Sequence, residues 1–266
     1  MMLQKKPTKR RAIPSSFDVI GNKDRAVAII EVPQPLQKRK KLLADAVMLQ
    51  HKNVVSVLEK ASPRFGTFRT RKLKIIKGSR NTEVVHVESG CRFAVDPRNS
   101  YFSQREGTER MRVASLVKEG ESVMVFFAGI GPFAIVIAKK ARPRAVVGVE
   151  INPAAVKCFE KSITLNKLDN VKAVLGDVHE KSRDYHGFDR VIMPLPETSF
   201  DFIEDAKRVL RKGGVMHVYF FAREDEVKMK KKFVAEKLPG SSVQGVSRVL
   251  PYGPRIWKWR MDVATR

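Results

Sequence analysis

Two glycines and two carboxylates in the second half of the chain have the spacing of a nucleotide pocket. Gly129 and Gly131 lie in the stretch FFAGIGPF, where an apolar run turns into a helix-like one. Glycine permits a tight turn and lets a ligand come close to the backbone. Glu150 and Asp177 end the next two apolar runs. The first carboxylate can accept both hydroxyls of a ribose, and the second can accept from an adenine amino group. The set therefore predicts a cofactor that contains adenosine.

Two cofactors compete for this pocket. The pattern Gly129-x-Gly131-x-x-Ala134 formally fits the dinucleotide fingerprint. Pro132, however, follows the second glycine and has no N–H to offer a pyrophosphate. Asp177 also suits a mononucleoside sulfonium better. We favour S-adenosyl-L-methionine over a dinucleotide, and a glycine turn without a ligand is the remaining alternative.

The elements that must position these residues follow from the pattern after about residue 108. Continuous apolar runs alternate with helix-like segments, which indicates an α/β fold with a parallel sheet covered on both faces. Strands are expected at 121–129, 144–153, 171–178, 187–196, 215–221 and 256–264. Helices are expected at 131–141, 153–168 and 199–214, the last of them stopped by two glycines.

The first hundred residues have a different character, and the chain divides into three parts. Residues 1–15 form a basic flexible arm, and residues 16–97 form a small α+β domain. A basic helix is expected at 37–51, with Leu42, Leu43, Ala46 and Leu49 on its apolar face. Residues 98–266 hold the cofactor domain.

Composition narrows the class of partner. The 266 residues include 52 lysines and arginines against 28 acids, a net charge of +24. An enzyme of small metabolites does not need this charge, so it favours nucleic acid. The two cysteines and five histidines have no metal-binding spacing, and no apolar run reaches transmembrane length. We expect a cytoplasmic monomer without a metal and without a membrane partner.

A family resemblance rests on five motifs that occur in order. They are YFSQREGTERMR, FFAGIGPFAI, VEINPAAV, LGDV and RVIMPLP, preceded by FGTFRTRKLKIIKG and TEVVHVESGCRFAVD. From about Ser16 onward the chain resembles the archaeal and eukaryotic type of tRNA guanine-37 N1-methyltransferase. The resemblance implies a Rossmann-like class I methyltransferase domain with a mostly parallel seven-stranded sheet, its last strand antiparallel. It also implies a tRNA anticodon loop as the partner.

The resemblance also implies residue roles. Glu109 matches the proposed general base, and Arg69 matches the arginine that stabilises charge on the target guanine. Arg105, Arg110 and Pro194 correspond to substrate-binding positions. The expected cofactor-binding residues are Tyr101, Phe127, Ala128, Gly129, Gly131, Pro132, Glu150, Ile151, Asp177 and Val178.

Chemistry supports a carboxylate together with an arginine. Guanine N1 carries a proton that it must lose before it attacks a methyl group, and a carboxylate can take this proton. Negative charge then spreads to the neighbouring carbonyl oxygen, where a guanidinium stabilises it. By position alone, however, Glu109 would be read as a helix-dipole acid, and Arg69 as a phosphate or solvent contact.

Three departures from the family pattern stand out. The N-terminal domain that reads the tRNA elbow is expected to be absent, so charge must carry more of the binding. Val125 replaces an acid that usually buttresses the cofactor loop. Pro194 stands where most members have an asparagine, and a subgroup that departs there also methylates a tricyclic guanine derivative. A proline wall could admit that larger ring system, including C7 of a 4-demethylwyosine-type intermediate.

Three alternatives remain at this point. An aminocarboxypropyl transferase of wybutosine synthesis shares the domains and the cofactor, although GTER is the methyltransferase version of its segment. Another amino-methyltransferase would need a polar Asn/Asp-Pro-Pro-aromatic motif, which MPLP lacks. A non-catalytic tRNA-binding protein is favoured only by Val125 and Pro194.

Overall fold

The computed structural model describes residues 17–64 and 66–266, which form two compact units. The expected arm at 1–15 lies outside the described residues. The division falls within β5 (Val84–Glu88) and β6 (Cys91–Val95), which form a two-stranded sheet, and Val95–Arg98 belong again to the N-terminal unit. None of the described helices is long and apolar enough to cross a membrane.

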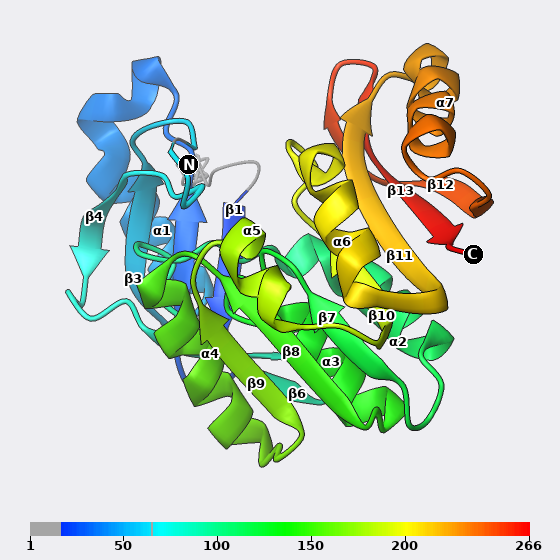
Figure 1. The fold of residues 1–266 in the computed structure, drawn as a ribbon. Coiled ribbons are helices and arrows are strands. Elements are labelled where there is room, and N and C mark those ends of the chain that lie inside the picture. Colours follow the sequence, from blue (N-terminus) through cyan, green and yellow to red (C-terminus); the bar gives the residue numbers. More distant parts are fainter. Residues whose placement is uncertain (1–16, 65) are drawn as a thin grey trace, which may run out of the picture. The chain divides into compact units, whose positions relative to one another are not determined.

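The N-terminal unit is a four-stranded sheet covered by one helix (Figure 1). Its strands lie in chain order: β1 (Phe17–Gly21), β2 (Ala26–Ile30), β3 (Val54–Lys60) and β4 (Leu73–Gly78). Only β2 and β3 are parallel, and a parallel pair needs a crossover connection. The segment η1 (Gln34–Arg39) and helix α1 (Lys40–Gln50) supply that crossover.

The apolar face expected for α1 was half wrong. Leu43 and Ala46 are buried as expected, but Leu42 and Leu49 are among the exposed hydrophobic side chains. The helix instead buries Ala44 and Val47 beside Leu43 and Ala46. A stripe one residue away fits the 3.6-residue period equally well, so packing on the sheet decides between the two.

The C-terminal unit is a seven-stranded sheet in the order β12-β13-β11-β10-β7-β8-β9. The expected sheet is confirmed: the five strands from β11 to β9 are parallel, and the last strand of the chain, β13, is antiparallel to β11. The strands are β7 (Ser122–Val125), β8 (Ala145–Glu150), β9 (Val171–Leu175), β10 (Phe188–Met193), β11 (Leu210–Ala222), β12 (Ser242–Gly253) and β13 (Ile256–Ala264).

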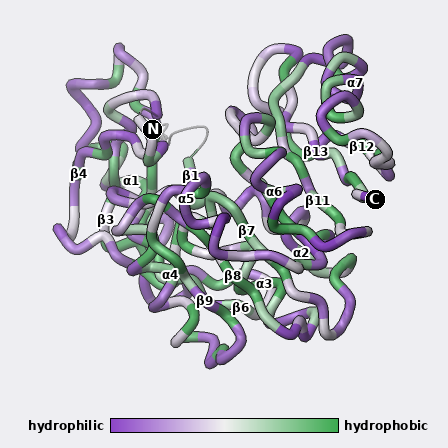
Figure 2. The backbone as a smooth tube through the Cα atoms, viewed as in Figure 1, coloured by the Kyte–Doolittle hydropathy of each residue, from purple (hydrophilic) through white to green (hydrophobic). Residues whose placement is uncertain are grey.

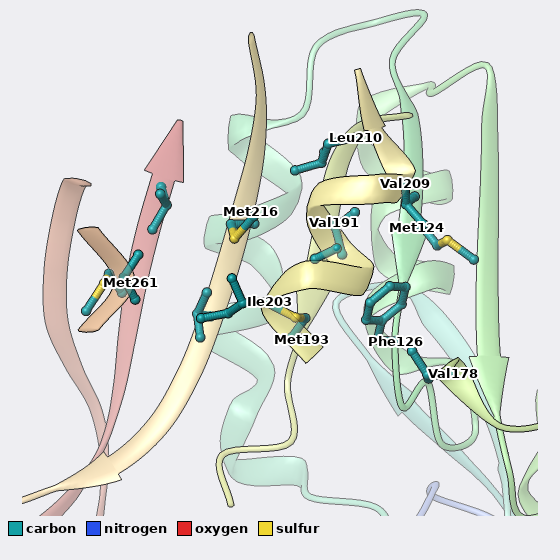
Figure 3. Close-up of a cluster of buried hydrophobic side chains, with 14 of the residues drawn as sticks. Met124, Phe126, Val178, Val191, Met193, Ile203, Val209, Leu210, Met216 and Met261 are labelled. Atoms are coloured by element: carbon teal, nitrogen blue, oxygen red, sulfur yellow. The ribbon is translucent and has the colours of Figure 1, made fainter. Parts of the chain in front are cut away.

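The two faces of this sheet carry different helices. One hydrophobic cluster joins the sheet to α5 (Val178–Lys181), α6 (Ile203–Val209) and α7 (Val227–Lys237). Figure 3 shows its α5 and α6 side chains, Val178, Ile203 and Val209, beside the strand residues. On the other face, α2 (Gly107–Leu116) packs against α3 (Pro132–Ala141), which packs against α4 (Pro153–Asn166). In Figure 2 the core strands β7, β8 and β11 are mainly green, and α7 is largely purple.

The helix expected at 199–214 was wrong at its C-terminal end. Helix α6 stops at Val209, and β11 begins at Leu210 and runs through both glycines. Gly213 has φ of 75°, and the β10–β11 pairing shifts register before Arg190. The glycines therefore accommodate an irregularity at the start of a long strand.

Candidate functional site

The loop between β7 and α3 uses the left-handed backbone region three times. Phe127, Gly129 and Gly131 have φ of 52°, 58° and 80°. A Cβ added at Gly129 would meet only the backbone oxygen of Tyr101, at 3.7 Å, whereas at Gly131 it would lie 2.0 Å from the ring of Phe159. The first glycine thus leaves space that a ligand could occupy, and the second is required by packing against α4.

Glu150 ends β8 and is held by backbone amides. Its Oε2 accepts from the N–H of Gly129 at 2.7 Å, and its Oε1 accepts from the N–H of Asn152 at 2.8 Å. Burial raises the pKa of Glu150, although these backbone hydrogen bonds oppose the shift. Each oxygen keeps a further lone pair, so the oriented carboxylate can accept the two hydroxyls of a ribose.

The other expected cofactor residues lie at the same edge of the sheet. Ala128 and Pro132 follow β7, Ile151 follows β8, and Asp177 and Val178 follow β9. Ligands of open parallel sheets bind outside the carboxyl ends of the strands. The Asp177 carboxylate caps α5 by accepting from the N–H of His179 at 2.7 Å, and the Val178 side chain belongs to the core. Val178 could therefore contact a ligand chiefly through its backbone.

An aromatic group beside this edge was missed from the sequence. Phe202 packs edge-on against Phe127, with ring centroids 4.7 Å apart, and stacks on His179 at 4.1 Å. The Nδ1 atom of His179 is 2.6 Å from the carboxylate of Asp205. The two phenylalanines of SFDF carried no distinguishing spacing in the sequence, so only the fold brings Phe202 to the glycine loop.

Glu109 lies in the first turn of α2 and is buried against β11. Its Oε1 accepts from the Tyr219 hydroxyl at 2.5 Å, and both of its oxygens accept from Arg112, at 2.7 to 3.1 Å. Arg260 lies 3.8 Å away. Burial and the Glu109 carboxylate together raise the pKa of Tyr219 well above its usual value, so the phenol stays protonated and donates. The carboxylate is therefore fixed in orientation by three partners.

A polar seam continues behind Glu109 between α2 and the sheet. Arg112 also contacts Asp262, which accepts from Nδ1 of His217 at 2.7 Å. The Nε2 atom of His217 is 2.7 Å from Arg190. A neutral imidazole with its proton on Nδ1 satisfies both contacts. Burial lowers the pKa of His217 despite the attraction of Asp262, which agrees with that neutral state.

Pro194 is tied to the same seam by a buried lysine. The Nζ of Lys258 donates to the Pro194 carbonyl at 3.1 Å and to Glu106 at 2.9 Å, and it lies 4.9 Å from the Tyr219 ring centre. Glu106 directly precedes α2. One ammonium group therefore links the proline at the end of β10 to the helix that carries Glu109. Because Lys258 already donates to the Pro194 carbonyl, the half-buried proline ring is the part of Pro194 that a ligand could contact.

The remaining expected substrate residues have different environments. Arg110 is almost fully buried, forms a bidentate pair with Glu88 at 2.9 and 2.5 Å, and donates to the Ser103 carbonyl. These contacts anchor α2, and the expected base contact of Arg110 stays a prediction. Arg105 is exposed on η2 (Gln104–Glu106), and the backbone of Tyr101 borders the glycine loop.

Arg69 lies in the N-terminal unit, at the end of the turn 66–69, and its own φ is 54°. Its expected role, to stabilise negative charge on the target guanine, stays a prediction. Val125 is fully buried at the end of β7, in register with Gly148 and Ile192. Among residues 17–64 and 66–266, no group of three or more potential ligands could hold a metal ion.

Comparison with known families agrees with this arrangement. Residues 84–241 match the family described as "TRM5/TYW2 methyltransferase domain", and residues 1–82 match "TYW2 N-terminal domain". The chain belongs to the TRM5/TYW2 methyltransferase family. The family expected from the sequence motifs is therefore confirmed.

Individual relatives include more than one activity within this family. The chain is 44% identical to tRNA (guanine(37)-N(1))-methyltransferase Trm5b of Pyrococcus abyssi over 82% of its own length, and it spans 63% of that protein. It is 34% identical, over 74% of its length and 80% of the relative, to a tRNA(Phe) (4-demethylwyosine(37)-C(7)) aminocarboxypropyltransferase of Methanocaldococcus jannaschii. It is 29% identical, over 83% and 89%, to tRNA (guanine(37)-N(1))/4-demethylwyosine(37)-methyltransferase Taw22 of Nanoarchaeum equitans.

Solved structures of the family share the fold. Pyrococcus abyssi Trm5b matches with a TM-score of 0.84 at 37% identity, covering 99% of this chain and 82% of that one. The structure of aTrm5 in complex with tRNALeu also matches with a TM-score of 0.84 at 31% identity, covering 96% of this chain and 73% of that one. M. jannaschii TYW2 in complex with AdoMet matches with a TM-score of 0.71 at 28% identity, covering 94% of this chain and 98% of that one.

Proposed function

We propose that this chain transfers a methyl group from S-adenosyl-L-methionine to N1 of the guanosine at position 37 of tRNA. The observation that carries the proposal is Glu109, a buried carboxylate that Tyr219 and Arg112 hold at the start of α2. Membership of the TRM5/TYW2 family and 44% identity to a tRNA (guanine(37)-N(1))-methyltransferase support it.

The residues at the carboxyl edge of the sheet fit the proposed cofactor. Glu150 offers an oriented carboxylate to the ribose, Gly129 leaves open space beside it, and Asp177, at the start of α5, is the acid proposed to accept from the adenine amino group. When bound, S-adenosyl-L-methionine supplies a methyl group activated by a sulfonium. Phe127 and Phe202, whose rings pack edge to face, would give the bound cofactor an apolar neighbour that excludes water.

The proposed roles at the base divide between two residues. Glu109 takes the proton from guanine N1 as the N1–methyl bond forms, so the proton moves to the carboxylate. Arg69 stabilises the negative charge that spreads to the guanine carbonyl oxygen. Tyr219 and Arg112 keep the carboxylate from rotating away from the base. Arg105 and Arg110 contact the RNA or the base, and Pro194 forms one wall of the base pocket.

The proposed partner is the anticodon loop of tRNA. A net charge of +24 supports binding to a polyanion. In this proposal residues 1–15 are a basic arm, residues 16–97 position the RNA and residues 98–266 carry out the transfer. The protein acts as a monomer in the cytoplasm.

Mass spectrometry of position 37 tests the proposal directly. Unmodified tRNA incubated with the protein and cofactor should gain one methyl group at N1 of guanosine 37. The variant Glu109→Gln should slow this transfer sharply while it keeps tRNA affinity, because the amide is neutral and similar in shape. A tRNA without any mass change at position 37 would refute the function.

Three specific observations favour a second candidate function. Residues 1–82 match the TYW2 N-terminal domain, and a relative at 34% identity is an aminocarboxypropyltransferase. That activity would add a whole aminocarboxypropyl chain, which the same mass spectrum distinguishes. Pro194 favours additional methylation at C7 of a 4-demethylwyosine-type base, because its flat apolar ring admits a wider ring system than an asparagine would. A tRNA carrying that tricyclic base is the substrate that tests it.

A further inference from the structure

An aromatic pair, an exposed tyrosine on a half-buried phenylalanine, lies where β11 ends and β12 turns into β13. The ring of Tyr252 stacks on Phe221, with centroids 3.8 Å apart and ring planes 28° from parallel. Tyr252 is nevertheless 60% exposed. One face of the tyrosine ring therefore packs on Phe221, and its outer face is open to a flat ligand.

The position of this pair relates it to the proposed base pocket. Phe221 is two residues beyond Tyr219 on β11, so both side chains point to the α2 face of the sheet. Tyr219 donates to Glu109, and a strand rises about 3.3 Å per residue, so Phe221 lies about 7 Å further toward the carboxyl end. Lys258, which donates to the Pro194 carbonyl, is the register partner of Phe221 on β13. The stack therefore borders the groups that are proposed to surround the target base.

Positive charge lies beside the same surface. Arg255 is exposed in the turn from β12 to β13. Arg105 is exposed on η2, a segment that packs beside β12. Aromatic faces flanked by arginines are how proteins bind unpaired nucleobases, since every base has a π-face and every linkage a phosphate.

We propose that the outer face of Tyr252 stacks on an unpaired nucleobase of the RNA, the one next to the base that is methylated. The proposal rests on the proposed function, from which the RNA ligand comes. Phe221 supports the tyrosine from behind, and Arg255 and Arg105 bind the adjacent phosphates. The stacked neighbour fixes the strand beside Pro194, so that the target base enters the pocket in one register.

The test uses the full chain and anticodon stem-loops that carry 2-aminopurine on the 5′ or the 3′ side of the target. With the wild type, one of the two probes should be quenched on binding. Tyr252→Ala should abolish this quenching and weaken affinity about five- to 150-fold, the range for loss of one stacked base. Tyr252→Trp should keep both the quenching and the wild-type affinity, because indole also offers a flat face. Met229→Ala on α7, an exposed apolar residue with similar accessibility, is the control and should change neither.

The outcomes separate this proposal from the proposed function. Unchanged quenching in Tyr252→Ala would overturn the proposed stacking on Tyr252, because it excludes a stack with that ring. An equal loss of quenching and affinity in Tyr252→Trp would also overturn it, because it indicates only a folding role for the tyrosine. Wild-type binding without quenching of either probe would overturn it as well. Quenching by the wild type without any methylated product would refute the proposed function but would still support stacking of the RNA base on Tyr252.

Discussion

Gly131→Ala should destabilise the C-terminal unit much more than Gly129→Ala, although both belong to one glycine motif. Each substitution places an alanine in the left-handed region, at φ of 80° and 58°, at a cost of about 1–2 kcal/mol. Only at Gly131 would the new Cβ also lie 2.0 Å from the ring of Phe159. Phe159 is fully buried in α4, so the overpacking adds about 1–3 kcal/mol. The expected totals are about 2–5 kcal/mol for Gly131→Ala and about 1–2 kcal/mol for Gly129→Ala.

Urea unfolding followed by circular dichroism measures these differences in the free energy of unfolding. A double-mutant cycle with Phe159→Leu isolates the clash, because the smaller side chain makes room for the Cβ. The coupling should favour the double variant by about 1–3 kcal/mol, which is the overpacking part. Equal destabilisation by the two alanines, or a coupling near zero, would refute the assignment of Gly131 to packing.

Three further predictions follow from the buried polar groups and the proline wall. Lys258→Met should lower the free energy of unfolding by about 3–5 kcal/mol because it leaves Glu106 buried and unpaired, and the double variant Lys258→Met/Glu106→Gln should regain most of it in the same urea titration. The pKa of His217 is lower in the folded than in the unfolded chain, so the unfolded chain binds more protons below about pH 6.5. The free energy of unfolding should therefore decrease as the pH is lowered below that value, and the decrease should be smaller in His217→Gln. Pro194→Asn should reduce turnover of a tRNA with the tricyclic base more than that of a tRNA with guanosine in steady-state assays, and equal effects would contradict the widened-pocket hypothesis.

The sheet could be predicted because parallel strands buried on both faces give continuous apolar runs. The runs around Met124, Val147 and Val191 belong to strands whose ends carry the candidate residues. Strand β12 was not assigned, because SVQGVSRVLPYG mixes polar residues, glycine and proline without a clear period. Its pairing with β13 shifts register at three places, and tertiary contacts overcome the weak local pattern.

The cofactor edge could be predicted better than the base pocket, for a physical reason. Gly129 and Glu150 follow consecutive strands, and topology alone brings the carboxyl ends of such strands together. Arg112, one partner of Glu109, lies on the same helix, but the other two, Tyr219 and Arg260, come from β11 and β13, more than a hundred residues away. The alternation at Lys258, Arg260 and Asp262 indicates a strand with one polar face, and such a face usually meets solvent. Here it meets α2 instead.

The polar seam explains how one site can combine a fixed base with a variable wall. Glu109 is oriented by Tyr219 and Arg112, whereas Pro194 depends on the single ammonium of Lys258. A buried carboxylate with three partners resists reorientation, because each lost contact leaves a desolvated charge less well paired. The wall is free of that constraint, since the Pro194 ring makes its contacts by shape alone. Substitutions at the wall can therefore change which ring system enters the pocket without disturbing the group that removes the proton.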